Sequence, residues 1–81
     1  MLLARVFSNI YKENGGIILI DVKGQKYICG NPLKEKPITL KLMKENLEWK
    51  LIIDPEISFP EAYMNDEIII ENASLKEFLM S

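Results

Sequence analysis

One short run, residues 38–43, restricts the folds open to this chain more than any other part of the sequence. Its apolar side chains alternate with Thr39 and Lys41, and they are Ile38, Leu40 and Leu42. A strand places successive side chains on opposite faces of its sheet, so this run predicts a strand with one buried and one wet face. Such strands are typical of antiparallel sheets that pack one face on the core.

Three further runs predict strands. Residues 17–22 and 26–29 are rich in β-branched and aromatic side chains, and Lys23-Gly24 between them predicts a hairpin turn. Residues 67–71 predict a fourth strand, which follows a turn at Asn65-Asp66. The chain therefore supplies short strands separated by turn signals.

Apolar stripes predict two helices. A stripe over residues 2–13 predicts a first helix, which Asn14-Gly15-Gly16 ends because glycine tolerates the left-handed conformation. Residues 45–54 predict a short helix that Asp54-Pro55 ends, since the residue before proline avoids the helical region. Trp49 in this segment fits the core or a domain interface better than a lipid anchor.

Two Ser-x-x-Glu patterns have the spacing of a capping box, in which serine and glutamate satisfy backbone N–H groups reciprocally. Ser58 and Glu61 predict a helix over residues 59–64, which gives Glu61 a structural role. Ser74 and Glu77 predict the start of a last helix.

These elements predict an α+β fold: a small antiparallel sheet of about four strands with short helices packed on it. We expect the first and last helices to share one face of the sheet. The 81 residues fit a single small domain spanning 1–81. A domain of this size buries little surface, which favours a homo-oligomer.

Composition narrows the classes of function. The net charge of -2 and the pI near 5.1 argue against a nucleic-acid partner. The chain has no histidine, which excludes a Ser-His-Asp triad and a His-ligated zinc site. The single cysteine, Cys29, cannot form an internal disulfide, fits a reducing cytoplasm, and is expected to be a buried small hydrophobe. We therefore expect no catalytic, cofactor-binding or metal-binding residues in this chain.

The segment "FPEAYMNDEIIIE", residues 59–71, gathers an aromatic, a methionine and several carboxylates before an apolar run. From the residues alone it could be an active-site corner, a docking surface or an ordinary turn into a strand. Its carboxylates are Glu61, Asp66, Glu67 and Glu71, and solvated strand ends and helix caps explain them better than general acid–base catalysis.

The order of features resembles the small N-terminal domain of cyclopropane-fatty-acyl-phospholipid synthases, a family of S-adenosylmethionine-dependent lipid methyltransferases. The most distinctive match is Glu61-Ala62-Tyr63-Met64, where the family has G-E-(A/S)-Y-M-D-G. Residues 38–42 match its I-x-L-(R/K)-(L/V) piece, and residues 75–79 match its L-x-x-(L/F)-L piece. Two departures are Pro60 in place of glycine and Asn65-Asp66 in place of Asp-Gly.

The resemblance implies a non-catalytic accessory domain, truncated from a longer enzyme. In the family, S-adenosylmethionine binds in a separate C-terminal Rossmann-like domain, which we expect as the partner within the same parent chain. A phospholipid membrane surface is a further expected partner, with a cytoplasmic location that extends to the inner membrane surface. The resemblance makes Glu61, Tyr63 and Met64, with their neighbours Asn65 and Asp66, an interdomain or lipid-side corner.

Two other functions stay open at this point. A stand-alone protein-binding or dimerisation module would have the same fold and no enzymatic role. A small independent enzyme is the least favoured, because no pair of nucleophile and base is visible in the sequence.

Overall fold

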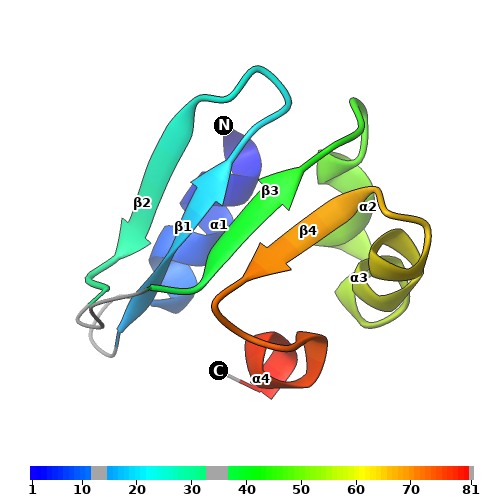
Figure 1. Ribbon diagram of the computed structural model, residues 1–81. Coiled ribbons are helices and arrows are strands. Elements are labelled where there is room, and N and C mark those ends of the chain that lie inside the picture. Colours follow the sequence, from blue (N-terminus) through cyan, green and yellow to red (C-terminus); the bar gives the residue numbers. More distant parts are fainter. Residues whose placement is uncertain (12–14, 33–36, 81) are drawn as a thin grey trace.

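The structure is a computed structural model that describes residues 1–11, 15–32 and 37–80 (Figure 1). Its strands are β1 (Gly16–Ile20), β2 (Lys26–Gly30), β3 (Thr39–Leu42) and β4 (Ile68–Glu71). Its helices are α1 (Leu2–Ile10), α2 (Glu48–Ile53), α3 (Pro55–Met64) and α4 (Leu75–Met80). The α+β class with a four-stranded sheet is therefore confirmed.

The sheet is mixed, with the strand order β2-β1-β3-β4. The pairs β1/β2 and β3/β4 are antiparallel, as predicted, but the central pair β1/β3 is parallel. The chain turns back after β1 into β2 and then reaches the other side of β1, where β3 runs in the direction of β1. The alternation of apolar and polar side chains in residues 38–43 cannot reveal this, because such a pattern identifies the faces of a strand and not the strand's direction.

A tight turn joins β1 to β2. Gly24 has a φ of 85° and lies in the predicted turn, where glycine carries no steric penalty. The Asp21 carboxylate accepts hydrogen bonds from the backbone N–H groups of Lys23 (3.0 Å) and Gln25 (2.9 Å) and from the Tyr27 hydroxyl (3.2 Å). The hydrogen bond from Gln25 is the largest cause that lowers the pKa of Asp21. This turn fixes the register of the edge strand β2.

The helices cover one face of the sheet (Figure 1). The sheet's inner face contributes Ile17, Leu19, Cys29, Leu40, Leu42 and Ile68 to the buried core. Three phenylalanines join the helices over it: the ring centroids of Phe7 and Phe59 lie 6.3 Å apart, those of Phe7 and Phe78 6.1 Å, and those of Phe59 and Phe78 5.3 Å. Thus α1 and α4 share one face of the sheet, as predicted.

The predicted helix ends were correct in some places and wrong in others. Helix α1 ends at Ile10, and Tyr11 donates its backbone N–H to the Phe7 carbonyl (2.9 Å); the remaining predicted residues 12 and 13 lie outside the described residues. The capping box at Ser74 and Glu77 is confirmed, with both reciprocal hydrogen bonds at 3.0 and 3.1 Å.

The capping box at Ser58 is wrong, because α3 begins earlier. Pro55 occupies its first turn, a position where proline's missing N–H costs nothing. Ser58 then donates its backbone N–H to the Asp54 carbonyl (2.9 Å) within the helix. Pro60 lies inside the helix and gives up one hydrogen bond. The Glu61 side chain therefore does not cap the start of α3.

Trp49 is not a core residue, since 55% of its surface is exposed. Leu47 and Leu51, four residues apart, take the buried positions of this segment and turn Trp49 outward. The Lys50 ammonium lies 5.9 Å from the centre of its ring.

We predict that Phe59→Ala lowers the free energy of unfolding by about 3 kcal/mol, because it removes the ring that contacts Phe7 and Phe78. Urea denaturation followed by circular dichroism measures this loss. The matched control is Ile57→Ala on the exposed side of the same helix, which should change stability by less than about 0.5 kcal/mol. Equal losses in the two variants would contradict the aromatic cluster as the junction of the helices.

Candidate functional site

The five residues of the predicted corner come together at the end of α3. Glu61, Tyr63 and Met64 belong to its last turns, Asn65 is its C-cap, and Asp66 lies in the turn to β4. All five are exposed, with 80% of Met64 and 42% of Tyr63 open to solvent. The corner is therefore a surface feature and contributes little to the core.

Side-chain packing and two features of the backbone hold this corner in place. Phe59 and Ala62 anchor the other side of α3 in the core. The Glu67 N–H donates to the Ala62 carbonyl (2.8 Å), which ties the end of the helix to the start of β4. Asp66 has a φ of 57°, in the left-handed region that aspartate enters more readily than most residues.

Further exposed apolar side chains, beyond those of the corner, lie on α2 and α3. Trp49 and Ile53 are four residues apart and share a face of α2, while Ile57 and Met64 share a face of α3. The two helices contact one another. We call the exposed set Trp49, Ile53, Ile57, Tyr63 and Met64 the α2–α3 surface. The spacing of Trp49 and Ile53, offset from Leu47 and Leu51, was the signal that could have revealed it.

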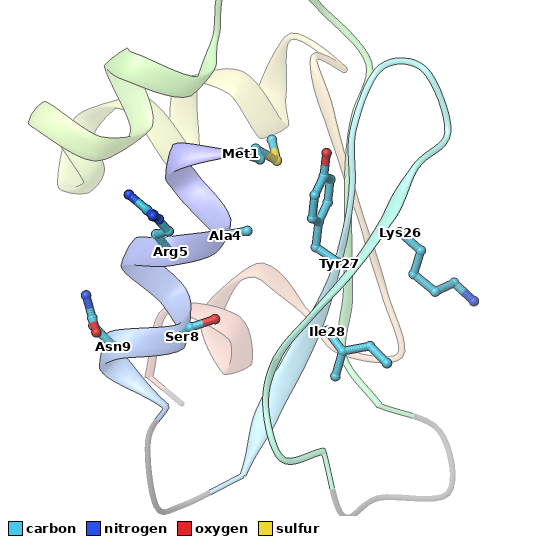
Figure 2. Close-up of a pocket in the computed structure, with 8 residues that line it drawn as sticks. All are labelled: Met1, Ala4, Arg5, Ser8, Asn9, Lys26, Tyr27 and Ile28. Atoms are coloured by element: carbon cyan, nitrogen blue, oxygen red, sulfur yellow. The ribbon is translucent and has the colours of Figure 1, made fainter.

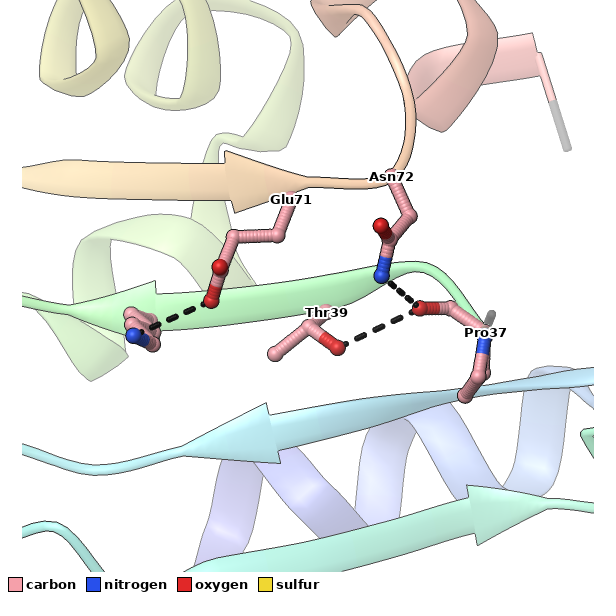
Figure 3. A network of polar contacts seen from close by, with 5 residues as sticks. Pro37, Thr39, Glu71 and Asn72 are labelled. Carbon is pink, nitrogen blue, oxygen red and sulfur yellow. Dashed lines mark hydrogen bonds and ion pairs between the residues drawn. The ribbon is translucent and has the colours of Figure 1, made fainter. Parts of the chain in front are cut away.

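Two of the carboxylates after the corner form ion pairs that join β3 and its flanking turn to β4. Glu67 pairs with Lys44 and Glu71 with Lys41, each at 3.0 Å. Figure 3 shows the Glu71 pair beside the adjoining contact, in which Asn72 donates its side-chain N–H to the Pro37 carbonyl (2.9 Å). These contacts give the carboxylates a structural role at the surface.

Figure 3 also shows Thr39, whose hydroxyl donates to the same Pro37 carbonyl (3.3 Å). This carbonyl thus accepts one hydrogen bond from the start of β3 and one from the end of β4. The two donors fix the chain where it enters the sheet, and they leave the corner at the opposite end of β4.

Cys29 is fully buried on the inner face of β2. Burial is the largest effect on this group and raises the pKa of its thiol, although a side-chain hydrogen bond with Ser8 acts in the opposite direction. The expectation of a buried small hydrophobe is confirmed.

In residues 1–11, 15–32 and 37–80, no three His, Cys, Asp or Glu side chains gather closely enough to hold a metal ion. Over the same ranges, no helix has the length and apolar character needed to cross a membrane.

Comparisons with known proteins identify no relative: no family model, no curated protein and no solved structure matches this chain.

We predict that Cys29 reacts with iodoacetamide at pH 8 at least about 100-fold more slowly in the native chain than in urea, because the buried thiol gives little thiolate. Mass spectrometry at timed intervals measures the rate. Rapid alkylation of the folded chain would show that β2 opens readily and that Cys29 is not a core residue.

Proposed function

We propose that this chain is a non-catalytic accessory domain that docks on the catalytic domain of a cyclopropane-fatty-acyl-phospholipid synthase-like methyltransferase. The observation that carries the proposal is the exposure of Tyr63 and Met64 at the corner where the sequence most resembles that family. The proposed partner is the Rossmann-like domain of the same parent chain, and that domain would hold S-adenosylmethionine.

The α2–α3 surface supports a docking role. Isolated exposed apolar side chains are ordinary, but a group of large ones on adjoining elements is typical of interaction sites. Ile53 is 73% exposed and Ile57 is 61% exposed, so both have most of their surface available to a partner. A docked domain would cover apolar area that is otherwise hydrated.

The backbone at Asp66 also supports the proposed family. Its left-handed φ is a conformation that glycine adopts without strain. The family that the chain resembles has glycine at this position of its motif. The same turn geometry therefore accounts for glycine in the family and for aspartate, a tolerated replacement, in this chain.

The proposal includes a cytoplasmic location, extending to the inner membrane surface where phospholipid substrates lie. In this arrangement the domain contributes to assembly and lipid engagement, while methyl transfer takes place in the partner domain. The corner residues Glu61, Asn65 and Asp66 would form the polar rim around Tyr63 and Met64.

A stand-alone binding or dimerisation module is the second candidate, and the open face of the sheet favours it. This face carries Ile18, Ile20, Ile28 and Ile69 opposite the helices, as the strand register requires. Ile28 is 66% exposed. Sedimentation equilibrium of the chain distinguishes the two candidates, since a stable dimer that Ile28→Lys disrupts would favour the second.

Sequencing the coding DNA beyond Ser81 tests the proposed family. We expect an open reading frame that continues into a domain with a glycine-rich S-adenosylmethionine-binding loop. A stop codon directly after Ser81 would contradict an accessory domain within a longer enzyme.

In that longer enzyme, we predict that Tyr63→Ala and Met64→Asp each lower the rate of lipid methylation about tenfold, as interface residues can. Because both side chains are exposed, stability should change by less than about 0.5 kcal/mol. Ile69→Ala, on the open sheet face, is the control and should retain activity. A loss of stability in proportion to the lost activity would instead make Tyr63 a core residue.

A further inference from the structure

A groove of about 720 Å³ lies between α1 and the edge strand β2, away from the corner (Figure 2). Figure 2 shows Ala4 and Ser8 pointing from the helix toward the strand, with Tyr27 on the strand's inner side. Met1, Arg5 and Asn9 complete the helix side of the groove, and Lys26 and Ile28 complete the strand side.

The backbone of β2 presents free hydrogen-bonding positions to this groove. Two hydrogen bonds bracket the β1/β2 ladder: the Asp21 N–H donates to the Gln25 carbonyl and the Asn31 N–H to the Gly15 carbonyl, each at 3.0 Å. Along an antiparallel pair of strands, every second residue exchanges backbone hydrogen bonds with the other strand. Counted from the two bonds above, Tyr27 and Cys29 are the residues of β2 whose N–H and C=O groups bond with β1.

Lys26 and Ile28 fall on the other phase, so their N–H and C=O groups point away from β1. Among the strands of the described residues, β2 pairs with β1 alone and forms the edge of the sheet. An edge strand with outward N–H and C=O groups is the template for adding an extended peptide.

The charges of the groove select the kind of peptide. Arg5 and Lys26 are cationic, and none of the described residues that line the groove is acidic. Neither cation forms an ion pair with a carboxylate of residues 1–11, 15–32 or 37–80. Ser8 and Asn9 add polar groups on the helix side.

A second copy of this chain suits the groove poorly. Two β2 edges that paired with each other would place two cationic grooves, each lined by Arg5 and Lys26, next to one another, and the repulsion between them would oppose the pairing. A partner whose carboxylates face these cations would instead be held by electrostatic attraction.

We propose that the groove binds an extended acidic peptide segment of another protein, which adds to the sheet as a strand beside β2. Side chains alternate along the added strand, so neighbouring carboxylates face Arg5 on the helix side and Lys26 on the open face of the sheet. The hydrogen bonds of Lys26 and Ile28 would supply affinity, and the two cations would supply selectivity. This site is separate from the corner and does not depend on the proposed family.

Fluorescence anisotropy tests the proposal with a fluorescein-labelled seven-residue peptide, Val-Thr-Glu-Glu-Glu-Thr-Val, whose neighbouring Glu side chains point to both faces of the added strand, titrated with the 81-residue chain. A peptide with Lys in place of each Glu is the comparison. We expect the Glu peptide to bind at least about tenfold more tightly, with the difference decreasing as salt is added. Equal affinity for the two peptides would overturn the proposal.

A pair of variants at position 28 tests strand addition itself. Ile28→Pro removes an N–H that points away from β1, while Ile28→Ala keeps it and deletes most of the side chain. We expect Ile28→Pro to weaken binding about fivefold relative to Ile28→Ala, since one or two hydrogen bonds are lost. Equal affinities of two folded variants would contradict pairing at this edge.

Charge variants cover the case in which Ile28→Pro does not fold. Arg5→Gln and Lys26→Gln should each weaken binding of the Glu peptide about threefold to tenfold. Lys76→Gln on α4, an exposed lysine outside the groove, is the matched control and should bind as the unaltered chain does. If Lys76→Gln loses as much affinity as Arg5→Gln does, the peptide is attracted only by the net charge of the chain. That result would overturn the proposed site.

Discussion

The contact of Phe7 with Phe59 and Phe78 is the interaction on which the arrangement of this small fold depends. The three rings come from α1, α3 and α4, so a single cluster holds elements from both ends of the chain on one face of the sheet. With the helices on that side, the opposite face and the β2 edge of the sheet are left available. The surfaces that could bind partners follow from this one-sided packing.

Much of the fold could be predicted because local physics agrees with it. Ile38, Leu40 and Leu42 are buried as their alternation predicts, and Ser74 and Glu77 form both hydrogen bonds of a capping box. Thr39 on the opposite face is only 9% exposed, so the wet face that the pattern predicted is wrong at this residue of the central strand β3. The errors arose where two local signals competed. Both Pro55 and Ser58 can begin a helix, and in the structure α3 begins at Pro55. The parallel β1/β3 pairing depends on where the chain crosses the sheet, which side-chain patterns do not encode.

The candidate site could be predicted only in part. The resemblance identified the corner, and the structure gathers its five residues in an exposed position. The exposure of Trp49 could not be predicted from its size and hydrophobicity, which favour burial; the register of Leu47 and Leu51 decides it. The binding edge beside β2 could not be predicted, because it depends on which backbone groups of Lys26 and Ile28 point away from β1. Only the pairing of the two strands determines this.

Photocrosslinking from position 64 gives the most direct test of the docking role. Benzoylphenylalanine would replace Met64 in the proposed longer enzyme, and in a second variant it would replace Ile69 on the open sheet face. If α3 docks on the catalytic domain, irradiation at position 64 links peptides of the two domains, and irradiation at position 69 does not. No crosslink from position 64, in an enzyme that stays active, would contradict the docking of this corner.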